Sequence, residues 1–264
     1  MDLIQILILA IIQGVTEWLP ISSSGHLAIA QNYFGIESES AVIFDIATHV
    51  GTILVVLIAF RKDVVDILKA FFRADFESEE GKMALFIIVG SIPTAIIGFL
   101  LLYYDIIERL FSNSLMVGFA LVVTGTYLYV SRHAKDGKEL NPLDSMLIGI
   151  AQGLVTIPGL SRSGLTISTG LLRKVKGEEA LRYSFLLSIP AVFGAMVAAI
   201  VKKHASLTIG SLDFGLTVLG AITSFVVGYI SLKLLQTIFT KQKFHLFAYY
   251  CWIAGLITII LSVS

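Results

Sequence analysis

The stretch QGVTEWLPISSSGH, Gln13 to His26, lies between two apolar runs and carries a glutamate, a histidine and three serines. Pro20 interrupts any helix through this stretch, because proline lacks the amide hydrogen that a helix interior requires. A similar pattern returns later in the chain as QGLVTIPGLSRSGL, Gln152 to Leu165. The match in order and spacing predicts an internal duplication, with a shared turn signal rich in Gly and Ser as the alternative.

Composition places these two stretches in a membrane protein. Hydrophobic residues make up 56% of the 264 residues, charged residues only 14%, and the mean hydropathy is +0.87. Six apolar stretches come close to the ~20 residues that a bilayer crossing needs; they are residues 41–60, 83–104, 114–130, 183–201, 214–235 and 246–263. The sequence predicts an all-α polytopic protein in a single membrane domain, 1–264. Zero net charge and no basic stripe argue against a nucleic-acid partner.

Two segments, 1–35 and 143–172, fit no full crossing, because each consists of two short apolar halves. We predict that each forms a re-entrant helix-loop-helix hairpin. Three full crossings separate the hairpins, so the two repeats, about 1–131 and about 143–264, have inverted topology.

Lysine and arginine positions set the orientation, because cytoplasmic loops carry an excess of both. With six crossings, one side of the membrane has only three loop residues of this kind: Arg109, Lys202 and Lys203. Arg162 lies at the tip of the second hairpin, and the other fifteen lie on the opposite side, which is therefore predicted to be cytoplasmic. This distribution predicts a multi-pass protein of the cell membrane with both termini outside.

Irregular backbone at membrane depth persists only where protein or water satisfies its polar groups, so we expect the two hairpin tips to meet inside the bundle. Serines stand where the second half-helix of each hairpin begins, and a helix N-terminus favours anions. Arg162 is expensive to bury without an anionic partner. The predicted phosphate-binding residues are Ser22, Ser24, Gly25, Ser161, Arg162, Ser163, Gly164 and Thr166. A plain helix break is the alternative for the serines and glycines alone.

Gln13 and Glu17 are four residues apart and share one helix face, where an amide oxygen and a carboxylate could hold Mg²⁺ or Ca²⁺. Alternatively, Glu17 pairs with Arg162, and the two interpretations do not exclude each other. Ser23 lies three residues before His26, which could take its proton.

Asp45 and His49 lie one helical turn apart in the first full crossing. Ionisable groups inside a membrane are candidates for function, so this pair is predicted to contact and orient the residues that form the site at the two hairpin tips. A mutually satisfied polar pair that braces the hairpin is an equal alternative.

With these motifs the chain resembles the membrane-embedded undecaprenyl-diphosphate phosphatase family of the bacitracin-resistance type. The resemblance covers essentially the whole chain and rests on Gln13 and Glu17 followed by LPISSSGH, on PGLSRSG at 158–164, and on FDIATHVGT at 44–52. The first motif has glutamate in many members where this chain has Gln13.

The resemblance implies hydrolysis of a polyprenyl diphosphate lipid to the monophosphate, which recycles the carrier for cell-wall synthesis, at a site on the outer side. It implies catalytic roles for Glu17, Ser23, His26 and Arg162 and a divalent cation near Glu17. It leaves a homodimer open, and it leaves the nucleophile open between Ser23, which we favour with His26 as base, and His26. A secondary transporter or lipid flippase is the alternative function, because broken helices in inverted repeats also form transporter sites.

Overall fold

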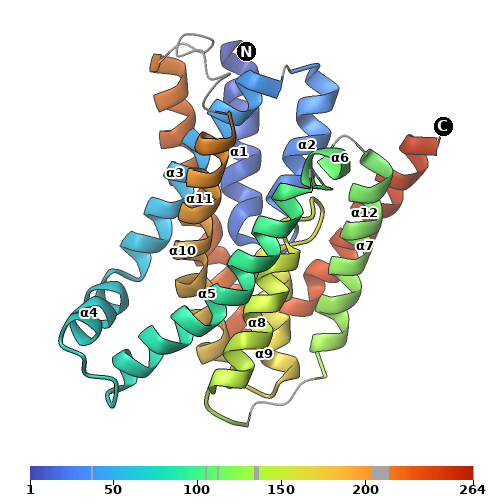
Figure 1. The fold of residues 1–264 in the computed structure, drawn as a ribbon. Helices are drawn as coiled ribbons and strands as arrows, with labels where there is room; N and C mark the ends of the chain where they lie inside the picture. The colour runs from blue at the N-terminus through green and yellow to red at the C-terminus, as the bar shows by residue number, and fades with distance from the viewer. Residues whose placement is uncertain (37, 105, 112, 134–136, 204–213, 264) are drawn as a thin grey trace.

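The computed structural model describes residues 1–36, 38–104, 106–111, 113–133, 137–203 and 214–263, and these residues form a bundle of α-helices (Figure 1). The helices are α1 (Leu3–Trp18), α2 (Ser23–Phe34), α3 (Ser38–Ala59), α4 (Arg61–Phe72), α5 (Glu79–Tyr103), α6 (Ile106–Phe111), α7 (Ser114–Ser131), α8 (Pro142–Leu154), α9 (Arg162–Leu172), α10 (Gly177–Lys203), α11 (Phe214–Thr240), the 3₁₀ turn η1 (Phe244–Leu246) and α12 (Phe247–Val263).

Six helical segments are long and apolar enough to cross a membrane, as predicted; they are Val42–Ala59, Glu79–Tyr103, Ser114–Ser131, Gly177–Val201, Phe214–Thr240 and Phe244–Val263. Their outer faces carry large apolar side chains that remain exposed, including Phe99, Ile230 and Leu261. A perimeter of this kind suits contact with lipid rather than water. The all-α polytopic membrane protein is therefore confirmed.

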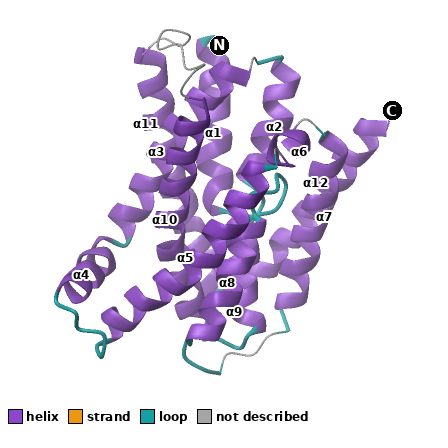
Figure 2. Cartoon of the chain, in the orientation of Figure 1, coloured by secondary structure: helices purple, strands orange, loops and turns teal. Residues whose placement is uncertain are grey.

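The two interrupted segments form matching hairpins, α1–α2 and α8–α9. Figure 1 shows α1 and α2 meeting the top of the bundle at their outer ends, whereas the outer ends of α8 and α9 lie at the bottom. The breaks between the paired helices are loops in the middle of the bundle (Figure 2). Ser22 caps α2 by accepting from the Gly25 amide, and Ser161 caps α9 by accepting from the Gly164 amide. The serines of the motif thus start the second helix of each hairpin.

The tips of the two hairpins touch, as the sequence predicts. A Cβ atom added at Gly25 would lie 3.0 Å from Cα of Gly159, so any larger residue would require one of the two tips to shift by a few tenths of an ångström. Gly159 has a φ of +97°, which side chains disfavour, and its carbonyl accepts a hydrogen bond of 3.1 Å from Thr124 of α7. The contact brings α1–α2 and α9 together at one interior point.

A buried apolar cluster includes residues of the first hairpin's break. Trp18 at the end of α1 packs edge-on against Phe185 of α10, with ring centroids 5.5 Å apart. The cluster also includes Leu19 and Ile21 from the first break and Leu128 of α7. Burial of these apolar side chains stabilises the position of the first hairpin's break within the bundle.

The predicted orientation depends partly on residues that the structure does not describe. Lys135 lies outside the described residues, and so do the side chains of Arg109, Lys202 and Lys203.

Candidate functional site

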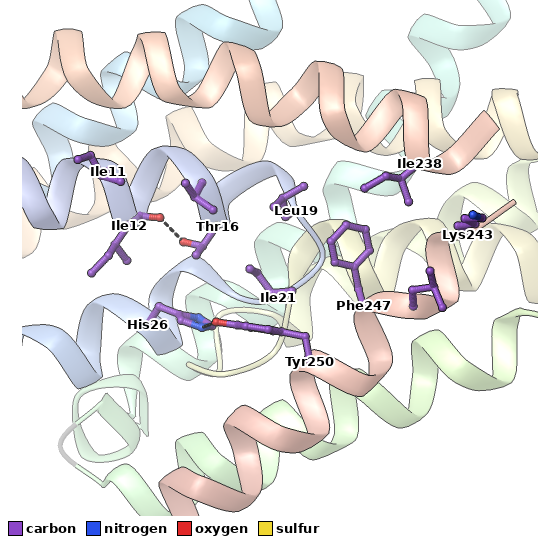
Figure 3. Close-up of a pocket in the computed structure, with 12 residues that line it drawn as sticks. Ile11, Ile12, Thr16, Leu19, Ile21, His26, Ile238, Lys243, Phe247 and Tyr250 are labelled. Carbon is purple, nitrogen blue, oxygen red and sulfur yellow. Dashed lines mark hydrogen bonds between the residues drawn. The ribbon is translucent and has the colours of Figure 1, made fainter. Parts of the chain in front are cut away.

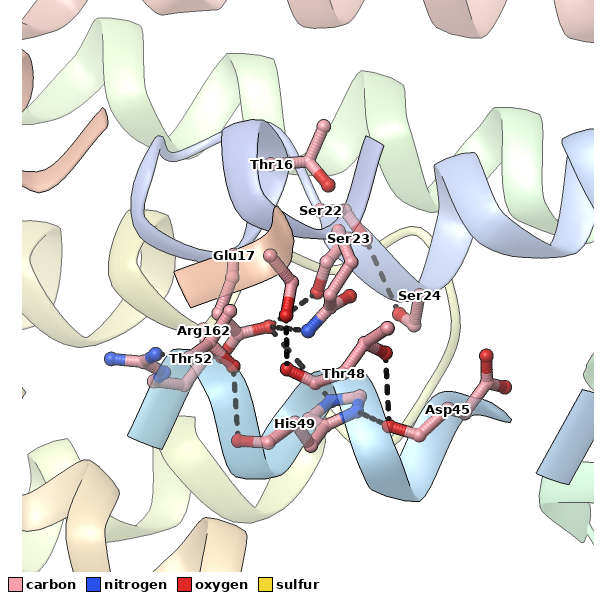
Figure 4. Close-up of polar contacts among 12 residues, drawn as sticks. Thr16, Glu17, Ser22, Ser23, Ser24, Asp45, Thr48, His49, Thr52 and Arg162 are labelled. Atoms are coloured by element: carbon pink, nitrogen blue, oxygen red, sulfur yellow. Dashed lines mark hydrogen bonds and ion pairs between the residues drawn. The ribbon is translucent and has the colours of Figure 1, made fainter. Parts of the chain in front are cut away.

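Glu17 is the centre of a polar cluster in which both carboxylate oxygens have partners (Figure 4). Oε2 accepts from Ser23 Oγ at 2.7 Å and from Gln13 Nε2 at 3.1 Å, and Oε1 accepts from Arg162 Nη2 at 2.9 Å. We call Gln13, Glu17, Ser23 and Arg162 the Glu17 cluster. The glutamate is buried, with 7% of its side chain exposed. A buried carboxylate requires such partners, and both hairpins provide them.

Arg162 is the first residue of α9 and reaches Glu17 from the second hairpin. Its guanidinium carbon lies 4.9 Å from the centre of the Trp18 ring, and 11% of its side chain is exposed. Nη1 is buried and has no hydrogen-bond partner among the described residues. The pairing with Glu17 that the sequence left open is present, and it still leaves one arm of the guanidinium for an anion.

The other predicted phosphate-binding residues divide into two groups. Two pairs are engaged as helix caps. The Gly25 amide donates to the Ser22 hydroxyl, and the Gly164 amide donates to the Ser161 hydroxyl. Thr166 is also engaged, because its hydroxyl donates to the Arg162 carbonyl and contacts Ser184 at 2.5 Å.

Ser24 and Ser163 each lie 3.4 Å, hydroxyl to hydroxyl, from the capping serine of their own helix. The first amides of a helix have no intrahelical acceptor. Those of Ser23 and Ser24 therefore remain more suitable for an anion than the two glycine amides.

His26 has different partners from those we expected. Its Nδ1 lies 2.7 Å from the Ser22 carbonyl, and its Nε2 lies 2.8 Å from the hydroxyl of Tyr250. A carbonyl only accepts, so Nδ1 carries a hydrogen, and in the neutral imidazole Nε2 accepts from the Tyr250 hydroxyl. Ser23 donates to Glu17, so the base next to Ser23 in this structure is Glu17. Spacing on the helix predicted that Ser23 and His26 are neighbours, but not which way the imidazole turns.

Ser22 has a φ of 71°, in the left-handed region that disfavours a serine, whereas Ser161 has a φ of −88°. Strain of about 1–3 kcal/mol at such a position requires compensating contacts. The hydrogen bond from His26 Nδ1 to the Ser22 carbonyl is one of them. His26 therefore helps to hold the turn that presents Ser23.

His26 and Tyr250 line an apolar groove of about 610 Å³ between α1, the end of α11 and the start of α12 (Figure 3). Its walls include Ile12, Leu19 and Phe247. None of the residues of the Glu17 cluster is among its lining residues. Tyr250 could not be anticipated, because it lies far along the chain from His26.

Asp45 and His49 lie on the face of α3 that looks toward the Glu17 cluster (Figure 4). The carboxylate of Asp45 accepts from Gln31 at 2.8 Å, and its backbone carbonyl lies 2.7 Å from His49 Nδ1. His49 Nε2 lies 3.9 Å from Glu17 Oε2. Of the two, His49 is therefore the residue that approaches the polar site directly.

The residues of the Glu17 cluster suit a cation that is completed by substrate oxygens. Gln13 is fully buried, and its Oε1 has no hydrogen-bond partner among the described residues. This oxygen and the Glu17 carboxylate are hard ligands. Within the described residues, no three His, Cys, Asp or Glu side chains are grouped to hold a metal ion. Gln13 and Glu17 alone would therefore leave a cation incompletely coordinated, so substrate phosphate would have to supply further oxygens.

Comparison with known proteins gives one consistent result. Residues 6–257 match the family model of the bacitracin resistance protein BacA. The chain is 42% identical to an undecaprenyl-diphosphatase of Desulforapulum autotrophicum over 98% of both chains. It is 40% identical to an undecaprenyl-diphosphatase of Korarchaeum cryptofilum, over 97% of this chain and 98% of the other. It is also 42% identical to one of Halothermothrix orenii over 99% of both.

Proposed function

The chain belongs to the bacitracin resistance protein BacA family and hydrolyses undecaprenyl diphosphate, and we propose that this reaction takes place at the Glu17 cluster. The observation that carries the proposal is the hydrogen bond of 2.7 Å from Ser23 Oγ to a carboxylate that also pairs with Arg162. A nucleophile beside a base, with the base held by a third group, is a recurrent arrangement in covalent catalysis.

In the proposed reaction, Ser23 Oγ attacks the terminal phosphorus while Glu17 Oε2 takes the hydroxyl proton. The bond from that phosphorus to the bridging oxygen breaks, and undecaprenyl phosphate leaves. Water then attacks the phosphorus of the phosphoserine, the bond from phosphorus to Oγ breaks, and inorganic phosphate leaves. The proton held by Glu17 returns to Oγ, which regenerates Ser23 and the carboxylate. Glu17 needs no rearrangement for the first step, because Arg162 already fixes the other carboxylate oxygen.

Arg162 Nη1 and the first amides of α2 would bind the oxygens of the transferred phosphoryl group, where charge develops in the transition state. Gln13 and Glu17 would hold a divalent cation, which when bound neutralises phosphate charge. The isoprenyl chain remains in the apolar phase around the bundle.

We expect Arg162→Lys to lose about 2–4 kcal/mol of transition-state stabilisation, nearly as much as Arg162→Ala. A single ammonium cannot pair with Glu17 and offer a second donor to phosphate at the same time. Turnover and thermal unfolding should be measured for both variants. The control is Arg182→Lys, which alters an ion pair with Asp63 away from the site and should keep its activity.

A highly active Arg162→Lys protein would mean that charge alone suffices at this position. If Arg162→Lys does not fold, Arg162 is primarily structural.

His26 is proposed to position Ser22 rather than to act as the base. His26→Ala is expected to lose about fivefold in turnover, because it removes the hydrogen bond to the Ser22 carbonyl, worth about 1 kcal/mol. His26→Asn can still donate to the Ser22 carbonyl but cannot serve as a base, so it should stay close to wild type. Tyr250→Phe should stay close to wild type, because the bond to Ser22 is untouched. Equal inactivity of the alanine and asparagine variants would favour a catalytic base.

Release of inorganic phosphate from undecaprenyl diphosphate by the purified protein in detergent tests the function itself. No gradient exists under these conditions, so a transporter or flippase would show no turnover. The convergence of Ser23, Glu17 and Arg162 on one point favours the phosphatase, because transport alone requires no nucleophile.

We further propose that the hairpins are re-entrant parts of an inverted repeat in the plasma membrane, with α1 and α2 opening to the outside. The lysine and arginine distribution supports this orientation. In a Cys251→Ser background, an impermeant thiol reagent should label Asn32→Cys on intact cells. It should label Glu139→Cys, whose native side chain is 82% exposed, only after lysis. The reverse pattern would invert the proposed orientation.

A further inference from the structure

One ring nitrogen of His49 forms a hydrogen bond to the backbone of its own helix, and the other faces Glu17. Nδ1 donates to the Asp45 carbonyl at 2.7 Å, so the lone pair of the neutral imidazole is on Nε2. Nε2 lies 3.9 Å from Glu17 Oε2, which is too long for a hydrogen bond. Two electron-pair donors this close repel each other unless a positive charge lies between them.

A second observation concerns Gln13, whose amide contacts the same carboxylate oxygen. Gln13 Oε1 is buried without a partner among the described residues, although its own Nε2 donates to Glu17 Oε2. A buried oxygen with no donor costs free energy unless something electropositive binds it. The Gln13 amide, the Ser23 hydroxyl and the His49 imidazole therefore converge on one oxygen of Glu17 from three elements: α1, α2 and α3.

We propose that His49 is a direct ligand of the divalent cation, through Nε2, and that the site therefore prefers a transition-metal ion such as Mn²⁺ over Ca²⁺. This inference rests on the proposed function of the Glu17 cluster. The separation of 3.9 Å is shorter than two metal-ligand bonds of about 2.0–2.2 Å laid end to end, so one ion can contact both side chains. Metal-binding histidines commonly donate their other ring N–H to a carbonyl, as His49 does.

The ligand types argue for the metal class. Ca²⁺ takes six to eight oxygen ligands, and Mg²⁺ also selects oxygen. Imidazole nitrogen raises affinity along the series from Mn²⁺ toward Zn²⁺. Gln13 is neutral, so Glu17 supplies the only negative side chain of the Glu17 cluster. One carboxylate attracts a hard cation weakly, and the nitrogen of His49 would add affinity for a transition-metal ion.

The test uses Mn²⁺ bound to the purified full-length protein without substrate. Pulsed electron paramagnetic resonance should show ¹⁴N coupling to the bound ion, replaced by ¹⁵N coupling when the protein carries ¹⁵N-labelled histidine. His49→Gln should abolish this coupling and weaken Mn²⁺ binding by at least ~10-fold. His245→Gln, in η1, is the matched control and should keep both.

Bound Mn²⁺ without nitrogen coupling would overturn the proposal, and so would tighter binding of Ca²⁺ than of Mn²⁺ in competition. In either case His49 would act as an imidazolium partner of Glu17 or as a structural residue. Because this readout needs no turnover, its failure leaves the phosphatase assignment intact. Conversely, full activity of Ser23→Ala would overturn the proposed site without affecting the nitrogen coupling.

Discussion

Glu17→Gln protein is expected to lose at least about 1,000-fold in turnover, within the range observed for a general acid-base group. The substitution keeps the size of the side chain but removes the oxygen that would take the Ser23 proton. It also removes the only negative charge that faces Arg162 in the Glu17 cluster, so the cation should bind more weakly.

Stability should fall together with activity, because the change leaves Arg162 buried without its anionic partner. Breaking a buried ion pair from one side costs about 3–5 kcal/mol. The double variant Glu17→Gln/Arg162→Gln removes both charges and should regain much of the lost thermal stability, but none of the lost turnover. This control separates chemistry from folding. Wild-type turnover of Glu17→Gln across a metal titration would show that the carboxylate is neither base nor ligand.

Hydropathy and helix-breaking residues predicted most of the fold. The six crossing segments follow from apolar runs of sufficient length, and the structure places each within six residues of its predicted ends. The hairpin breaks follow from Pro20 and Pro158 together with the capping serines, since these residues disfavour a continuous helix. Such signals are local, so a sequence is sufficient to find them.

The arrangement around Glu17 could be predicted only in part. Pairing of Glu17 with Arg162 follows from the cost of burying either charge alone, and the structure contains it. The aromatic ring of Trp18 against Arg162 had no signal in the sequence, because any large apolar residue would satisfy the hydropathy pattern there.

The expected partnership of Ser23 and His26 shows where helix spacing stops being informative. Residues three apart share a helix face, but rotamers decide what each side chain touches. Ser22 turns through a left-handed conformation, which brings its carbonyl to His26 Nδ1, and packing of α12 supplies Tyr250. Both effects depend on tertiary contacts, and so does the approach of His49 to Glu17.

Like Glu17→Gln, Ser23→Ala should lose most of its turnover, at least ~100-fold, if the serine is the nucleophile. The two effects should not add in the double variant, because a nucleophile and its base act as a unit. Ser24 is the natural comparison, since it is the next residue of the same helix and its hydroxyl lies 3.4 Å from Ser22 rather than beside Glu17. Ser24→Ala removes an equivalent hydroxyl without touching the proposed base.

Phosphate release from undecaprenyl diphosphate should therefore be measured for purified wild-type, Ser23→Ala and Ser24→Ala proteins under one saturating condition. We expect Ser24→Ala to stay within about threefold of wild type, because it loses at most one weak hydrogen bond of less than about 1 kcal/mol. Ser23→Ala should release almost none. Near-complete activity of Ser23→Ala, or a loss confined to Ser24→Ala, would contradict catalysis at the Glu17 cluster.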